Sequence, residues 1–278
     1  MSYRRIHFLI SAHGTPTSLA AIDFSCGFAH GIGAALDVTL PQVDVKAPQN
    51  WIAGKVMAGI ARDIEDTISA KRTELNEYLK QKCEAAGVGL SISSVTIDWP
   101  GGAPSLATFG RTSDLCLLGL RRSPVADIAE IEPWLFSTGR PCLLYPDTGT
   151  GGCSMDTVAI AWDMSRSAAR AVGDALPLLK GAKSVQVLVG RGEKAIESSR
   201  PAASLVGYLS AHGISAAVDE FDASGQKIGD ALLGRAARHR ADMLVMGAFG
   251  HSRLREFVLG GATRRILDAS SIPLLMSH

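Results

Sequence analysis

Four glycines toward the C-terminal end of the sequence have a spacing that suits phosphate binding. Gly247 and Gly250 follow the apolar run 243–246, and Gly260 and Gly261 stand just before a segment with helical spacing. Glycine lets the backbone approach a phosphate closely, and backbone N–H groups at a helix N-terminus favour bound anions. Strand, glycine loop and helix in this order predict an anion site, although turns and helix caps produce the same glycines.

The spacing of Gly247, Gly250 and Gly260 resembles the ATP-binding signature of the universal stress protein family, G-x2-G-x9-G-(S/T). The flanking segments are similar too, since Asp242 precedes the apolar strand and a closing strand follows at 271–276. The resemblance covers the second half of the chain well and the first half in outline.

One position departs from the family's signature. Gly261 stands where the family has Ser or Thr, so that a hydroxyl contact to phosphate is missing unless Thr263 supplies it from the next turn.

The resemblance implies a site for ATP or a related adenine nucleotide, with Mg²⁺ shared by the phosphates. Asp163, directly after the strand 157–162, would lie against adenine and ribose, unless it caps the helix that starts at Ser165. Val189 would line the base. Phosphates would meet the backbone of Gly247, Gly250, Gly260, Gly261 and Ala262, with His251, Ser252 and Thr263 as candidate side-chain contacts; His251 and Ser252 could equally face solvent.

Composition excludes several function classes. The 278 residues include 28 Lys and Arg against 27 Asp and Glu, and no basic stripe of the kind that nucleic acid requires. No apolar run approaches the roughly 20 residues of a membrane span, and the N-terminal one is too short for a signal peptide. Five cysteines without C-x-x-C spacing indicate a reducing, cytoplasmic setting and no metal cage.

Matching segments recur in the same order in both halves and indicate an internal duplication. The pairs are 111–119 with 239–247, 140–145 with 272–276, 84–91 with 210–217, and 8–15 with 158–165. The glycine-rich segment 146–154 is the predicted linker. We therefore predict two domains, 1–147 and 154–278.

Strand and helix patterns alternate in both halves. The predicted strands are 6–11, 37–40, 90–97, 115–118 and 142–145, then 157–162, 184–189, 216–221, 243–246 and 271–276. The predicted helices are 15–35, 51–86 (one or two), 104–112, 165–179, 196–212 (or from Pro201), 228–238 and 262–269, with a loop at 41–50. Such alternation predicts an α/β fold with right-handed crossovers and parallel sheets. The resemblance implies two Rossmann-like domains of the adenine nucleotide alpha hydrolase-like kind, each a five-stranded parallel sheet flanked by helices.

The first half lacks the glycine loop. Arg122 and Glu132 stand where the second half has Gly250 and Gly260, and His13 stands where the second half has Asp163. We expect no nucleotide to bind there in the family manner.

No catalytic constellation is present: the sequence has no phosphate-loop lysine motif, no serine elbow and no zinc-protease motif. We therefore expect a regulatory stress-response protein with at most slow ATP hydrolysis. One alternative is a structural or interaction member of the family that binds no nucleotide. Another is a nucleotide-dependent transferase, which the lack of lysine between Gly247 and Ala269 disfavours. Because family members pair through the last strand, the resemblance implies an intrachain pseudo-dimer, with a homodimer also open.

Overall fold

A computed structural model describes residues 2–12, 14–45, 54–99, 106–120, 126–147, 155–191, 201–248 and 261–278. The chain forms two compact units, one of Tyr3–Leu117 and one of Leu118–His278 together with Met1–Ser2. Their boundary lies inside a strand, so the units differ from the two sequence repeats. The predicted domain limits, 1–147 and 154–278, refer to the repeats and stay a prediction.

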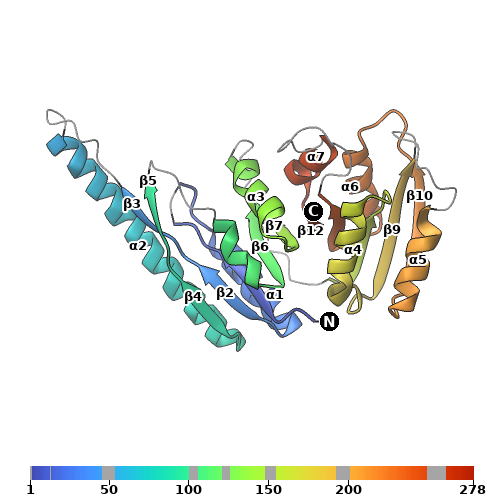
Figure 1. Ribbon diagram of the computed structural model, residues 1–278, viewed down its shortest axis with the longest axis horizontal. Coiled ribbons are helices and arrows are strands. Elements are labelled where there is room, and N and C mark those ends of the chain that lie inside the picture. The colour runs from blue at the N-terminus through green and yellow to red at the C-terminus, as the bar shows by residue number, and fades with distance from the viewer. Residues whose placement is uncertain are drawn as a thin grey trace. The chain divides into compact units, whose positions relative to one another are not determined.

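The first repeat is built from alternating strands and helices (Figure 1). Its strand order is β7-β6-β1-β2-β4, and the described pairings of β1 with β2 and β6, and of β2 with β4, are all parallel. Its elements are β1 (Arg5–Leu9), α1 (Leu19–Ile32), β2 (Ala35–Thr39), β3 (Gln42–Val45), α2 (Gly54–Ala86), β4 (Leu90–Ser93), β5 (Thr96–Trp99), the 3₁₀ helix η1 (Leu106–Thr112), β6 (Leu115–Leu120), α3 (Ala126–Ser137) and β7 (Cys142–Pro146).

The second repeat has the same order, β12-β11-β8-β9-β10, and its strands are also parallel to one another. Helix α4 packs over β11 and β12, α6 packs over β9, and α6 contacts α7. The α/β, Rossmann-like fold class is therefore confirmed, with one difference: the five strands of each repeat are halves of one ten-stranded sheet and not two separate sheets. The elements are β8 (Thr157–Ala161), α4 (Arg166–Leu179), β9 (Ser184–Arg191), α5 (Pro201–Ala211), β10 (Ala217–Asp222), α6 (Ile228–Arg238), β11 (Met243–Gly247), α7 (Gly261–Ala269) and β12 (Leu274–Ser277).

An aspartate just before the fourth strand of each repeat ties that strand to the first one. Asp242 Oδ2 accepts a hydrogen bond from Thr157 N at 2.8 Å, and the backbone N–H of Asp242 donates to Thr157 O at 2.8 Å. Asp114 Oδ2 accepts from Arg4 N and Arg5 N at 2.7 and 3.0 Å, and Asp114 N donates to Arg5 O at 2.8 Å. The two aspartates that the sequence alignment matched thus make the same contact.

Equivalent helices of the two repeats also begin and end with the same residue types. Ser18 caps α1 by accepting from Ala21 N at 3.0 Å, and Ser165 caps α4 by accepting from Ala168 N at 3.1 Å. Gly87 ends α2 and Gly213 follows α5, both with positive φ of 66° and 76°, which favours glycine.

The last strands of the two repeats, β7 and β12, pair antiparallel. Leu143 lies opposite Leu275, and these two leucines are equivalent positions of the duplicated sequence. The neighbouring pairs, Leu274 with Leu144 and Met276 with Cys142, are equivalent to each other. The register of this strand pair is therefore symmetric.

The structure corrects several predicted elements of the first repeat. The predicted strand 90–97 is two strands, β4 and β5, and the predicted loop 41–50 contains β3, which pairs with β5 in a separate two-stranded sheet. Helix α1 begins at Leu19 instead of residue 15, because Ser18 makes the cap. Helix α3, with Pro133 inside it, was not expected.

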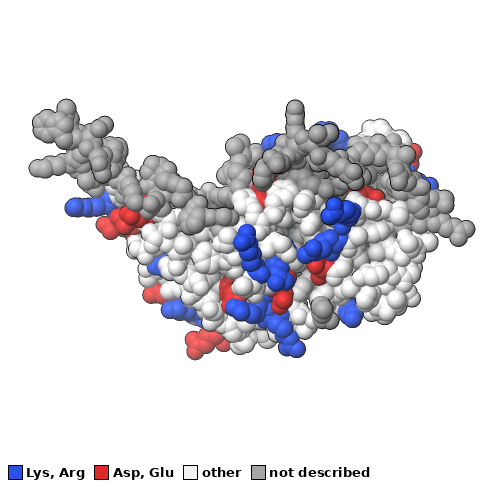
Figure 2. Space-filling view, in the orientation of Figure 1, with Lys and Arg blue, Asp and Glu red and all other residues white. Residues whose placement is uncertain are grey.

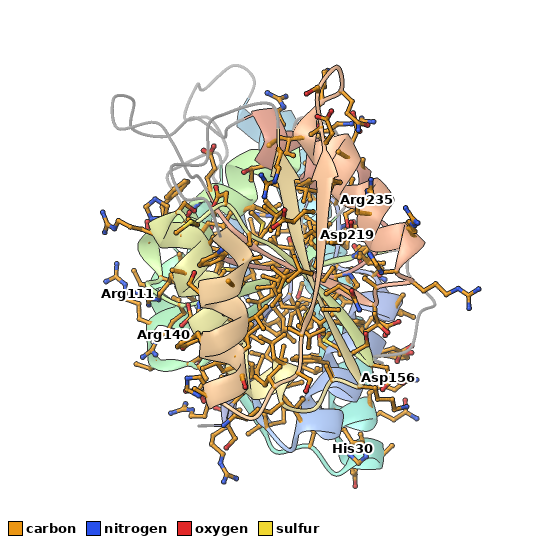
Figure 3. All side chains as sticks on the ribbon, turned by 90° about the vertical axis from the view of Figure 1, so that its right-hand side faces the viewer. His30, Arg111, Arg140, Asp156, Asp219 and Arg235 are labelled. Carbon is orange, nitrogen blue, oxygen red and sulfur yellow. The ribbon has the colours of Figure 1, made fainter. Side chains whose placement is uncertain are left out.

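Side-chain ion pairs reinforce the second repeat at its edge. Asp219 on β10 accepts from Arg235 Nη1 of α6 at 3.2 Å, and both residues are labelled in Figure 3. Asp219 also accepts from His239 Nε2 at 2.7 Å, and the Arg235 guanidinium lies 4.9 Å from the ring centre of Phe221. None of the helices in the described ranges has an apolar stretch long enough to cross a membrane.

Replacing Asp242 with alanine should lower the free energy of unfolding by about 1–3 kcal/mol, because the half-buried N–H of Thr157 loses a charged acceptor. Urea denaturation measures the change. Asp268→Ala, at an exposed position of α7, is the control and should change stability by less than about 0.5 kcal/mol. Equal effects of the two substitutions would contradict the role given to Asp242.

Buried His7 should make folding stability depend on pH. Burial lowers the pKa of His7 from 6.5 to about 4, although the Asp37 carboxylate, its register partner on β2, acts to raise it. Between these values the unfolded chain binds more protons, so that stability rises with pH from about 4 to 6.5, by up to about 3 kcal/mol. Urea unfolding across this range should show a shallower pH dependence for His7→Leu than for wild type, and equal slopes would refute the assignment.

Candidate functional site

The carboxyl ends of β8 and β11 meet at the point where the strand order of the second repeat reverses. Ala159 of β8 is paired with Leu244 of β11, while the chain leaves β8 toward β9 on the opposite side. In open parallel sheets, ligands bind in the crevice at such a reversal. Asp163, which follows β8, and Gly247, the last residue of β11, both belong to this place.

Asp163 stabilises the turn that leads into α4. Its Oδ1 accepts a hydrogen bond from Ser165 N at 2.9 Å, and Met164 between them has a left-handed φ of 63°. Ser165, not Asp163, is the residue whose side chain caps α4. The Asp163 side chain is exposed, at the end of β8 where the resemblance expects a nucleotide contact.

The absence of a side chain at Gly247 is explained by packing. A Cβ atom there would lie 2.5 Å from Ala168 N and 2.6 Å from Ser167 Oγ, in the first turn of α4. The Ser167 hydroxyl also lies 3.1 Å from Ser165 Oγ. The sequence prediction missed Ser167 and Ala168, because it assigned the glycine to a phosphate and not to a neighbouring helix.

The end of β9 is filled by apolar side chains. Val189 is completely buried, so its side chain belongs to the core, and only its backbone remains to line a base. At Gly190 a Cβ would collide with Ile228 Cδ1 and would lie 3.3 Å from the ring of Phe221. Val189 therefore has no exposed side-chain surface that could make the predicted apolar contact with a base.

The start of α7 contains Gly261, Ala262 and Thr263. A Cβ atom on Gly261 would meet nothing within 4 Å, so packing does not require glycine there. Thr263 is 5% exposed, which leaves its hydroxyl little access to a ligand. Four further predicted positions lie outside the described residues: Gly250, His251, Ser252 and Gly260.

Two ion pairs join neighbouring elements of the second repeat, one between β9 and β10 and one between α6 and α7. Arg191 Nη2 lies 2.5 Å from Glu220 Oε2, and Arg265 Nε lies 2.5 Å from Asp230 Oδ1. A hydrogen bond from Ser224 lowers the pKa of Asp222 at the end of β10. On the face shown in Figure 2, basic side chains stand beside acidic ones. Within the described ranges, no cluster of three or more His, Cys, Asp or Glu side chains could hold a metal ion.

Gly247→Ala should destabilise the second repeat by about 1–3 kcal/mol, because its methyl group would overlap the first turn of α4. Gly173→Ala, in α4 itself, is the matched control: its Cβ would meet nothing within 4 Å, and removing a helical glycine should stabilise by about 0.5–1 kcal/mol. Thermal unfolding compares the two. A neutral or stabilising Gly247→Ala would contradict the packing explanation.

Residues 190–278 match the sequence model of the Universal stress protein family. No curated protein is similar enough in sequence to match the chain. A universal stress protein from Archaeoglobus fulgidus DSM 4304 has a similar structure, with a TM-score of 0.71, 17% identity, and coverage of 98% of this chain and 95% of that one. A functionally unknown protein from Pseudomonas aeruginosa PAO1 is also similar, with a TM-score of 0.58, 13% identity, and coverage of 99% and 92%.

At these identities the likeness to solved structures is one of fold, and it extends over nearly the full length of each chain. The family match is local and includes β11, α7 and β12, where the glycine spacing lies. The resemblance found in the sequence is thereby confirmed as a match of residues 190–278 to the universal stress protein family model, within a chain whose fold is similar, over nearly its full length, to that of a solved universal stress protein.

Proposed function

We propose that this chain is a tandem universal stress protein that binds ATP or a related adenine nucleotide in its second repeat and acts as a regulator. The observation that carries the proposal is the position of the glycine spacing in the fold. Gly247 ends β11 at the reversal of strand order, and Gly261 starts the helix that follows. The strand, the glycine-containing segment that follows it in the sequence and the helix N-terminus stand in the order that anion sites of α/β proteins use.

The phosphate end of the nucleotide is assigned to the start of α7. Gly261 has open space where a side chain would lie, and a helix N-terminus favours negative charge. The backbone of Gly260, Gly261 and Ala262 would face the phosphates, and Mg²⁺ would be bound through phosphate oxygens. Thr263 is buried, so its hydroxyl does not replace the one that is missing at Gly261.

The adenosine end is assigned to the exposed carboxylate of Asp163 and the backbone of Val189. These residues follow neighbouring strands: Ala161 of β8 pairs with Leu188 of β9, and Trp162 N donates to Leu188 O at 3.0 Å. A carboxylate at this position accepts hydrogen bonds from hydroxyl or amino groups.

A regulatory output fits the side chains present. The stretch from Gly247 to Ala269 contains no lysine, and no catalytic motif is present elsewhere in the sequence. Binding, with at most slow hydrolysis, is therefore the proposed activity. The symmetric antiparallel pairing of β7 and β12 supports an intrachain pseudo-dimer through the last strands, and a cytoplasmic location and a further homodimer remain part of the same proposal.

The second candidate is a family member that binds no nucleotide and acts through protein contacts. The buried side chains of Val189 and Thr263 favour it, because each removes one contact expected from the family signature. Two measurements separate the candidates. Adenine nucleotide that co-purifies with the protein, detected by mass spectrometry, supports the first candidate. A protein that binds no nucleotide even when ATP is titrated into it supports the second.

Gly261→Glu should weaken binding of a fluorescent ATP analogue by roughly tenfold or more, because a carboxylate would face the phosphates. The substitution should not disturb folding: the position has room, and an acidic residue suits the first turn of a helix. Fluorescence titration with thermal unfolding of each variant measures both effects. We expect Gly250→Glu, outside the described residues, to weaken binding as well.

Gly207→Glu is the matched control for charge. Gly207 lies on the exposed side of α5 and has no atom within 4 Å of its Cβ position, so affinity should equal that of wild type. Equal affinity in wild type and Gly261→Glu would remove the phosphate site from α7.

A further inference from the structure

Two buried thiols touch between the first two helices of the first repeat. Cys26 on α1 and Cys83 on α2 are 57 positions apart in sequence, and their Sγ atoms lie 3.3 Å apart. Their side chains are 3% and 1% exposed, and both are free thiols. A disulfide needs about 2.05 Å between the sulfurs, so a small shift of one side chain brings the atoms to bonding distance.

The other described cysteines have different neighbours. The thiol of Cys116 on β6 lies 3.9 Å from Gly110 O, and that of Cys142 on β7 lies 3.9 Å from Arg140 O. Cys26 and Cys83 are therefore the pair whose sulfurs meet within the described part of the chain.

Packing does not require sulfur at these positions, as the second repeat demonstrates. Counted from the capping serines Ser18 and Ser165, Cys26 corresponds to Gly173 of α4. Cys83 corresponds to Leu209, because the carbonyls of both accept from the residue five positions later at 2.9 Å. The same fold is thus built with glycine and leucine where the first repeat has two cysteines.

The hydrogen bond between the thiols divides their roles. It lowers the pKa of Cys83, and it raises the pKa of Cys26, to which burial and the Asp23 carboxylate also contribute while Lys82 acts in the opposite direction. Cys83 is therefore the thiol of the pair that ionises more readily, and its thiolate would accept the hydrogen bond from Cys26. The thiolate is the form that reacts with oxidants.

A polar cluster holds the two helices together beside the thiols. Tyr78 Oη donates to the carboxylate of Asp23 at 3.0 and 3.1 Å, and Lys82 Nζ lies 2.9 Å from Asp23 Oδ1. Lys82 Nζ also lies 5.0 Å from the ring centre of Tyr78. Asp23 is one helical turn before Cys26, and Lys82 precedes Cys83, so these contacts keep the sulfurs facing each other.

We propose that Cys26 and Cys83 are a redox modification site, at which a hydroperoxide produces a reversible disulfide that joins α1 to α2. Cys83 thiolate attacks a hydrogen peroxide oxygen, the O–O bond breaks, and the leaving hydroxide takes up the proton that Cys83 released on ionising, which gives water and Cys83 sulfenic acid. Cys26 sulfur then attacks the Cys83 sulfenic acid, the S–O bond breaks, and a second water leaves with the Cys26 proton. Two thiols and one peroxide thus give one disulfide and two waters, and a small dithiol reverses the reaction.

The test uses the full chain carrying Cys153→Ser, which removes the cysteine outside the described residues. The reduced protein is treated with hydrogen peroxide, alkylated, digested without reduction and analysed by mass spectrometry. We expect a peptide in which Cys26 is joined to Cys83, and a melting temperature higher than that of the reduced form by roughly 5–10 °C. Dithiothreitol should reverse both.

Matched variants identify the thiols responsible. Cys83→Ala should abolish the cross-linked peptide and the rise in melting temperature, whereas Cys116→Ala and Cys142→Ala should retain both. The peptide measurement on the Cys153→Ser chain stands even if Cys83→Ala fails to fold. Free Cys26 and Cys83 after peroxide, oxidation of Cys83 to sulfinic acid without a cross-link, or a disulfide to another cysteine would each overturn the proposal.

Discussion

The close approach of α4 to the end of β11 is the constraint on which the arrangement of the second repeat depends. With no side chain at Gly247, the first turn of α4 comes within contact distance of the strand backbone. At its other end the same strand is joined to β8 through Asp242 and Thr157. Strand β11 is therefore fixed at both ends to the β8–α4 segment, and Asp163, in the turn between β8 and α4, is positioned at the reversal of strand order as a result.

Much of the fold could be predicted from sequence because apolar runs and glycine stops report local structure directly. The small sheet of β3 and β5 could not. Its strands have four residues each and pair only with each other in the described structure, so their formation is a tertiary property. The same two chain segments form the β2–β4 pair and then the β3–β5 pair, with an interruption between the two pairs. At the interruption Leu40 N donates to Ser93 O and Gln42 N donates to Val95 O, but Pro41 between them has no N–H to donate. In a sequence, a proline is as typical of a loop as of such an interruption between two strand pairs, so a loop is predicted at 41–50.

The candidate site could be predicted in place but not in detail, because glycine has two physical uses that look alike in a sequence. At Gly247 a side chain would collide with the first turn of α4, so packing alone accounts for this glycine. At Gly261 a side chain would meet nothing. Packing therefore leaves Gly261 unexplained, and the anion proposed at this helix start would account for it.

The two repeats share the contacts that hold the sheet together, and they differ at residues that make no such contacts. Asp114 and Asp242 make the same strand contact, and Leu143 faces its own equivalent Leu275 across the β7–β12 pair, because a shift of register would turn buried side chains outward. Loops and helix faces carry no such restriction. The second repeat has glycines where the first has Arg122 and Glu132, and the first has a thiol pair where the second has Gly173 and Leu209. Duplication of the sheet thus allows each repeat a separate chemistry, since neither the glycine loop nor the thiol pair is needed for the strand order common to both.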